Sequence, residues 1–321
     1  MYDLVSKRFW FFLFSGIVIL PGIISLVLPG GLRPGIDFTS GSIATIHFQQ
    51  PVEQQALREA YAELGHHEAI VQRSDDGTYI VRTLPLGSEQ RDESGNVSQA
   101  SERQRVEQAL QEKFGPLTVL SFDQVSPIVA AEVVRNAFLA VLVACAGITL
   151  YLWWAFRQVR ESWRYGVCAV VALIHDVLVV VGVFSILGRL FAVELDALFI
   201  TAVLTIIGFS VHDTIVVFDR VRENSVRHMG EPFEDIVNHS LMQTMGRSLT
   251  TSLTVMLTLL TLFLFGGVTI RSFVLALLVG IFSGTYSSIF NASMLLVVWE
   301  RGDLGRLFGR GGAGQPALAR A

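Results

Sequence analysis

Long apolar runs alternate with polar segments along the whole chain. A membrane-spanning helix needs roughly 20 predominantly apolar residues, and six runs come close to that length or exceed it. They occupy residues 9–28, 136–156, 165–187, 195–218, 248–267 and 272–299. The pattern predicts an α-helical polytopic membrane protein with six transmembrane helices.

The segment between the first two runs has no long apolar stretch, and its apolar residues recur with the spacing of strands and short helices. Alternation predicts strands at 42–49 and 117–125, and a hairpin over 69–83 with its turn at Asp76-Gly77. Helical spacing predicts helices at 51–65 and 101–115, the second with Ser101 and Gln104 as a capping box. Residues 88–99 are polar and predict a loop. The order β-α-β-β-α-β is typical of a ferredoxin-like α+β domain.

The amino-acid composition is also typical of a protein embedded in a lipid bilayer. Hydrophobic residues make up 51% of the 321 residues and charged residues only 16%, against about 25% charged in a soluble domain. The mean hydropathy is +0.52. The first run has a long apolar core and no small-residue cleavage site after it, so we interpret it as a retained helix and not as a signal peptide.

Lys and Arg gather in alternate loops, which predicts the orientation. The N-terminus, the loops after the second and fourth runs and the C-terminal tail are rich in them, whereas the other short loops hold only Arg189 and Arg271. Cytoplasmic loops carry the excess of Lys and Arg, so we expect both termini in the cytoplasm. The expected division is a cytoplasmic N-terminus with helix 1 (1–29), an extracytoplasmic domain (30–132), helices 2–6 (133–300) and a cytoplasmic tail (301–321).

Charge and cysteine content exclude several classes of function. Residues 37–132 hold 7 Lys and Arg against 15 Asp and Glu, a net charge of −8, and nucleic-acid binding requires a basic face. Cys145 and Cys168 both lie in apolar runs, without metal-type spacing. His66 and His67 follow a predicted helix and are expected at the surface, so no metal site is predicted. No cofactor and no enzymatic activity are expected.

Ionisable residues lie inside three of the runs, and inserting each into a membrane costs about 2.5–3.5 kcal/mol on insertion scales. Such residues therefore indicate a function or a specific partner. They are His175 with Asp176, His212 with Asp213, and Arg247. A low-dielectric setting favours a neutral carboxyl group, whereas a nearby arginine favours the ionised form. Asp213 with Arg247 as counterion is therefore a candidate ion relay, and a static buried ion pair is the alternative.

The other three residues have weaker claims to that role. Asp176 is a further relay candidate. His175 and His212 are able to shuttle protons, or merely to form hydrogen bonds with a neighbouring helix. Threonines following Arg247 at 251, 254, 258 and 261 share one helical face, which favours a packing seam.

Motifs spread along the chain resemble the SecF family, within the resistance-nodulation-division (RND) superfamily. The motifs are GIDFTSGS at 35–42, IHD at 174–176, VHDTIVVFDRVREN at 211–224, RSLTTSLT at 247–254 and LFLFGG at 262–267. Six helices with one outer domain after the first match the family's plan as well. The motif at 211–224 is the most specific of them.

The resemblance implies a function and partners. SecF-like proteins pair with SecD, associate with the SecYEG channel and the ATPase SecA, and use the proton-motive force, or sodium in some bacteria, to drive preprotein export across the bacterial inner membrane. The family's key carboxylate and arginine map onto Asp213 and Arg247, and Gly35, Asp37 and Gly41 lie in its glycine motif, the expected coupling segment. H⁺ or Na⁺ would be the coupling ion, and unfolded preprotein and membrane lipid the other contacts.

Three alternatives remain open. The chain is a passive scaffold for SecD if its charges only fix helix packing. A small-molecule RND exporter is disfavoured, because such chains are much longer and carry two large outer domains. A membrane enzyme is least supported, since no nucleophile–base pair or metal set occurs in the sequence.

Overall fold

A computed structural model describes residues 3–73, 77–87, 90–91, 97–99, 101–157, 161–267 and 270–302. The chain divides into two compact units, one formed by residues 1–33 and 139–321 and the other by residues 34–138. Asp76 of the predicted turn and most of the expected tail lie outside the described residues.

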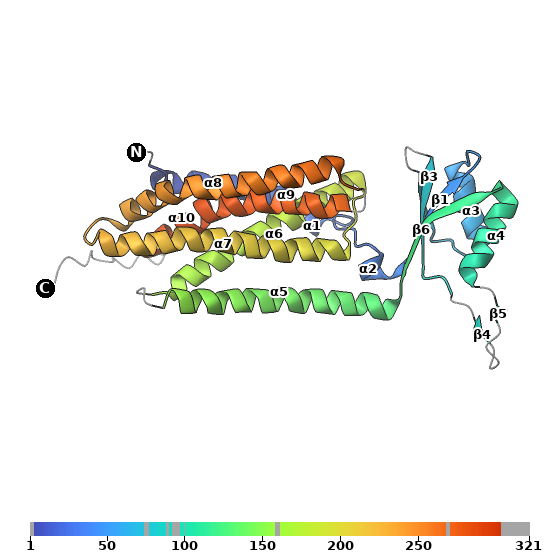
Figure 1. The fold of residues 1–321 in the computed structure, drawn as a ribbon, viewed down its shortest axis with the longest axis horizontal. Coiled ribbons are helices and arrows are strands. Elements are labelled where there is room, and N and C mark those ends of the chain that lie inside the picture. Colours follow the sequence, from blue (N-terminus) through green and yellow to red (C-terminus); the bar gives the residue numbers. More distant parts are fainter. Residues whose placement is uncertain are drawn as a thin grey trace. The chain divides into compact units, whose positions relative to one another are not determined.

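Among the described residues, six helical segments are long and apolar enough to cross a membrane, as predicted. They form the helical bundle of the first unit, except that the second of them begins in the second unit. In Figure 1 the long helices run side by side. The bounds are α1 Arg8–Val27, preceded by the short η1 Val5–Lys7; α5 Pro127–Ala155; α6 Trp163–Phe191; α7 Ala197–Arg227; α8 Phe233–Phe265; and α9 Arg271–Tyr286, which continues through the π-helical η3 Ser287–Ala292 into α10 Ser293–Glu300. The chain is a multi-pass membrane protein.

Three helices, α5, α7 and α8, extend well beyond the apolar runs that predicted them, and α7 and α8 show why. α7 continues to Arg227 and carries ion pairs on its last turns, Asp219 with Arg222 at 2.7 Å and Glu223 with Arg227 at 2.6 Å. α8 begins at Phe233, 15 residues before the predicted start, because this extension buries an apolar face that includes Leu241. An amphipathic extension is helical without being uniformly apolar, so a search for apolar runs misses it.

Glycines allow two close helix contacts in this unit. A Cβ on Gly22 of α1 would lie 2.7 Å from Gly182 Cα of α6, and three residues further on Ser25 and Ser185 share a hydrogen bond of 2.8 Å. Similarly, a Cβ on Gly280 of α9 would lie 2.2 Å from Ile206 Cδ1 of α7. The backbones of α1 and α6 approach this closely because both residues are glycine, whereas Gly280 leaves room on α9 for the Ile206 side chain of α7.

The second unit is built on a four-stranded antiparallel sheet of order β2-β3-β1-β6 (Figure 1). The strands are β1 Gly41–Phe48, β2 Ile70–Arg73, β3 Thr78–Thr83 and β6 Leu117–Val125, and the helices are α2 Ile36–Thr39, α3 Gln54–Glu63 and α4 Glu102–Phe114. Leu57 and Leu110 from the helices pack with Tyr79 and Val81 in one apolar core. α4 starts where Ser101 Oγ accepts a hydrogen bond from the Gln104 amide at 3.2 Å, as the predicted cap requires.

Two expectations for this unit are wrong. The region 88–99, expected as a loop, contains the short antiparallel pair β4 Gln90–Arg91 and β5 Val97–Gln99. His66, expected at the surface, is buried, with Nδ1 3.6 Å from Glu68 Oε1 and Nε2 3.5 Å from Glu102 Oε1. The two glutamates supply the polar environment that makes its burial tolerable, and His67 remains exposed.

Candidate functional site

Asp213 lies on the buried face of α7, and its two carboxylate oxygens have different surroundings. Oδ1 accepts a hydrogen bond of 2.5 Å from Ser248 Oγ on α8. Oδ2 is buried and has no hydrogen-bond partner among the described residues. An unsatisfied oxygen of a buried carboxylate is costly. The arrangement therefore favours either a neutral carboxyl group or a donor from outside this chain.

Arg247 does not form the predicted contact with Asp213. Its side chain is exposed, and within the described part of the chain no ion pair joins the two residues. The neighbouring Ser248 occupies the position facing α7 instead. His212 is exposed as well. Both cationic candidates are thus at the surface of the bundle, beside a buried carboxyl group.

Asp176, in the middle of α6, is enclosed by serine hydroxyls. Its side chain is fully buried. Oδ2 accepts hydrogen bonds from Ser210 of α7 at 2.6 Å and from Ser287 of the π segment at 2.7 Å, and Oδ1 accepts one from Ser283 of α9 at 2.8 Å. We call Asp176 and these three serines the Asp176 cage. Charge-assisted bonds of this kind are about twice as strong as neutral ones, so the cage ties three segments to α6.

His175 is next to the cage and adds a fourth contact. Its Nδ1 lies 3.1 Å from Asp176 Oδ1, and its ring stacks on Tyr286 with centroids 6.5 Å apart. Its Nε2 is buried without a partner among the described residues. His175 also lines a cavity of about 60 Å³ together with Ser15, Ser283 and Tyr286.

A second set of hydrogen bonds links the surroundings of the two aspartates. Thr285 of α9 donates to Ser252 of α8 at 2.6 Å, one turn beyond Ser248. Thr214, which follows Asp213, shares a hydrogen bond of 2.9 Å with Ser288 of the π segment. The polar core therefore spans α6, α7, α8 and α9.

Most of these hydroxyl groups were not predicted from the sequence. Serine is common at helix contacts in membranes, and the spacing of 283 with 287 and of 248 with 252 is one helical turn. That repeat is the signal that would have suggested two polar faces.

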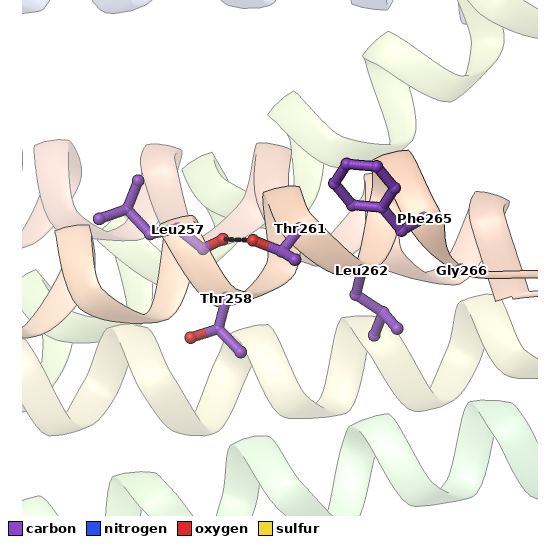
Figure 2. Close-up of a pocket in the computed structure, with 6 residues that line it drawn as sticks. All are labelled: Leu257, Thr258, Thr261, Leu262, Phe265 and Gly266. Carbon is purple, nitrogen blue, oxygen red and sulfur yellow. Dashed lines mark hydrogen bonds between the residues drawn. The ribbon is translucent and has the colours of Figure 1, made fainter.

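The threonine face of α8 does not form the expected packing seam within this chain. Thr251, Thr254, Thr258 and Thr261 are exposed. The hydroxyls of Thr254, Thr258 and Thr261 each bond the carbonyl four residues earlier, at 2.8–3.1 Å. Figure 2 shows a pocket of about 590 Å³ at the end of this face, where Thr258 and Leu262 point to one side of α8 and Phe265 to the other.

The predicted coupling motif forms a tight turn at the start of the second unit. Gly35 precedes α2, and its carbonyl accepts a hydrogen bond from Thr39 Oγ1 at 3.0 Å. Asp37 is in the first turn of that helix. Gly41 has φ +140°, and a Cβ there would lie 2.8 Å from Thr83 O. This position therefore requires glycine.

Comparisons with known proteins agree with the resemblance. The profile of the protein export membrane protein SecD/SecF C-terminal family matches residues 105–302, and that of the SecD/SecF GG motif matches residues 30–52. The chain is 51% identical to the protein translocase subunit SecF of Thermobaculum terrenum, over 97% of this chain and 98% of that protein, and 43% identical to that of Anaerolinea thermophila, over 99% and 100%. The crystal structure of SecDF from Thermus thermophilus, titled a translocon-associated membrane protein, superimposes with a TM-score of 0.75 at 34% identity and covers 94% of this chain, which spans 39% of that one.

Proposed function

The chain belongs to the SecF family of protein translocase subunits, and from that premise we propose that it couples the proton-motive force to protein export through protonation of Asp213. A role in protein export follows from the family itself. The coupling ion is inferred to be H⁺, with Na⁺ as the alternative.

The observation that carries the proposal is the incomplete hydrogen bonding of Asp213. One oxygen is held by Ser248, and the other is buried without a partner among the described residues. In the proposed cycle the carboxyl group is neutral in this arrangement. On ionisation its charge is compensated by Arg247, which approaches from the adjacent position on α8.

The available energy is sufficient for such a switch. Moving one charge through 100 mV supplies about 2.3 kcal/mol, which biases a two-state equilibrium roughly fifty-fold. The two ionisation states favour different contacts between α7 and α8, and the Gly35–Gly41 turn is proposed to transmit the difference to the outer unit.

The other relay candidates take different parts in this proposal. His212 is exposed next to Asp213 and is suited to pass a proton to a partner. Asp176 accepts hydrogen bonds from the three serines of the cage, and His175 contacts it from outside. A carboxylate with both oxygens paired is better suited to fix helices than to exchange protons.

SecD is the proposed partner of the exposed polar face. Ionisable and polar residues inside membranes face protein or water in preference to lipid, and Thr205, His212, Arg247 and Thr254 are all exposed on α7 and α8. The similar structure from Thermus thermophilus is named SecDF, which supports association with SecD and the translocon. SecYEG with SecA and an unfolded preprotein complete the proposed assembly.

The topology follows the charge pattern. We place both termini in the cytoplasm and the second unit outside the bacterial inner membrane. We assign that unit to the ferredoxin-like fold, which is supported by its sheet order β2-β3-β1-β6 and by the helices α3 and α4 in the two connections between strands.

The proposal is tested by preprotein translocation into inverted vesicles containing SecD, SecYEG and SecA, with and without an imposed proton gradient. Asp213→Asn should assemble with SecD but lose the gradient-dependent stimulation. The matched control is Asp219→Asn, which makes the same change on an exposed turn of the same helix and should keep it. Stimulation that survives in an assembled Asp213→Asn complex would reduce this chain to a scaffold.

A further inference from the structure

The last membrane helix is interrupted in its buried part. Between α9 and α10, residues Ser287–Ala292 form a π-helical segment, and Ser293 Oγ bonds the carbonyl of Ser288 five residues earlier at 3.3 Å. A π turn holds one residue more than the α-helix around it, is rare, and is found frequently at functional sites. Something in the surrounding structure has to maintain it.

The contacts that hold this segment come from two other helices, α6 and α7. Ser287 donates to Asp176 Oδ2 of α6 at 2.7 Å. Ser288 donates to the carbonyl of Ser210 of α7 at 3.0 Å and shares a hydrogen bond with Thr214. Both π serines are fully buried. Because both hydroxyl groups are shielded from solvent, these hydrogen bonds hold the segment at one rotation about the helix axis.

An α-helical register is the obvious second state of such a segment. If the same residues wound as an α-helix, the extra residue would join the regular turns, and α10 would rotate against α9 by about 100° and shift along the axis by about 1.5 Å. Ser283 lies in α9 before the π segment and would keep its bond to Asp176, whereas Ser287 is the first residue of the segment, so its bond anchors the end at which a change of register begins. The two serines, with equivalent bonds to one carboxylate, therefore differ in what they control.

We propose that Asp176 and Ser287 form a lock that holds the last membrane helix in its π register, and that the segment Ser287–Ala292 changes register during the transport cycle. The link to the cycle rests on the proposed function. It runs through Thr214, which is adjacent to Asp213 in α7 and contacts Ser288. A change in the position of Asp213 is thereby transmitted to the π segment.

The test is backbone hydrogen exchange of residues 287–298 in the full chain assembled with SecD. Ser287→Ala should raise exchange there about tenfold or more, because a charge-assisted hydrogen bond is lost. The matched control, Ser283→Ala, loses an equivalent bond to the same carboxylate and should leave exchange in 287–298 close to the native value. Equal effects of the two variants, or none, would overturn the lock.

The second arm separates this inference from the proposed function. Asp213→Asn should change exchange in 287–298 more than Asp219→Asn does. If Asp213→Asn abolishes gradient-dependent translocation but leaves exchange in this segment unchanged, the register change is wrong while the relay stands. If translocation keeps its stimulation, the relay fails, and the exchange of the two serine variants still decides the lock.

Discussion

Replacing Gly22 by alanine should push α1 away from α6. The added Cβ would lie 2.7 Å from Gly182 Cα, and ordinary contact begins at 3.4 Å. The atom that the new Cβ meets belongs to the backbone of α6, so no side-chain rotation relieves the clash. The helices have to separate by about 0.7 Å, the difference between these two distances, which also stretches the hydrogen bond between Ser25 and Ser185.

The cost can be worked out from these two effects. Overpacking costs about 1–3 kcal/mol, and a weakened hydrogen bond costs about 0.5–1.5 kcal/mol. Against this, alanine gains about 1 kcal/mol over glycine in a helix. Gly16 provides the matched control, because it lies in the same helix and a Cβ there meets nothing within 4 Å. Gly16→Ala should therefore gain helix propensity without a clash.

The gain in helix propensity is common to both variants, so their free energies of unfolding should differ by about 1.5–4.5 kcal/mol, with Gly22→Ala the less stable. The measurement is reversible unfolding in mixed detergent micelles, followed by circular dichroism. If Gly22→Ala is as stable as Gly16→Ala, the close contact of α1 with α6 is wrong.

Two further predictions concern the second unit. Gly41→Ala should destabilise it by about 1–3 kcal/mol, because the backbone there has φ +140° and the new Cβ would meet Thr83 O; a thermal unfolding transition of this unit unchanged from the native one would contradict that. Burial opposes the charged form of Glu68, but hydrogen bonds from its own amide and that of Leu84, together with His66, lower its pKa. Its stabilising effect is then complete above the unfolded pKa of about 4.3 and is lost as the pH falls through the lower folded value. The difference in unfolding temperature between the native chain and Glu68→Gln should thus close below about pH 4, and a difference that widens instead would refute this sign.

The apolar runs predicted the number and order of the membrane helices because the bilayer imposes a length on each. They did not predict the extensions of α7 and α8, which are amphipathic and depend on packing. The π segment has no sequence signature of its own, because it is maintained by Asp176 and other groups far away in the chain. The burial of His66 likewise depends on Glu102, which comes from a different helix.

The sequence predicted the burial of Asp213 but not the residues that contact it. Asp213 was identified correctly as a buried carboxyl group. Its expected partner Arg247 and its actual partner Ser248 are adjacent, and neighbouring residues project about 100° apart on a helix. Which of them faces α7 depends on the rotation of α8, and this is set by the packing of the whole bundle.

The central claim is the proposal that Asp213 exchanges a proton during transport. The most direct measurement is infrared difference spectroscopy of the complex reconstituted with SecD, after a step in pH, observing the carbonyl band of a protonated aspartic acid. We predict that this band contains a component of a buried aspartic acid in the native chain and in Asp176→Asn, and that Asp213→Asn lacks this component. A component that persists in Asp213→Asn and disappears in Asp176→Asn would contradict the account and move the proton-exchanging group to α6.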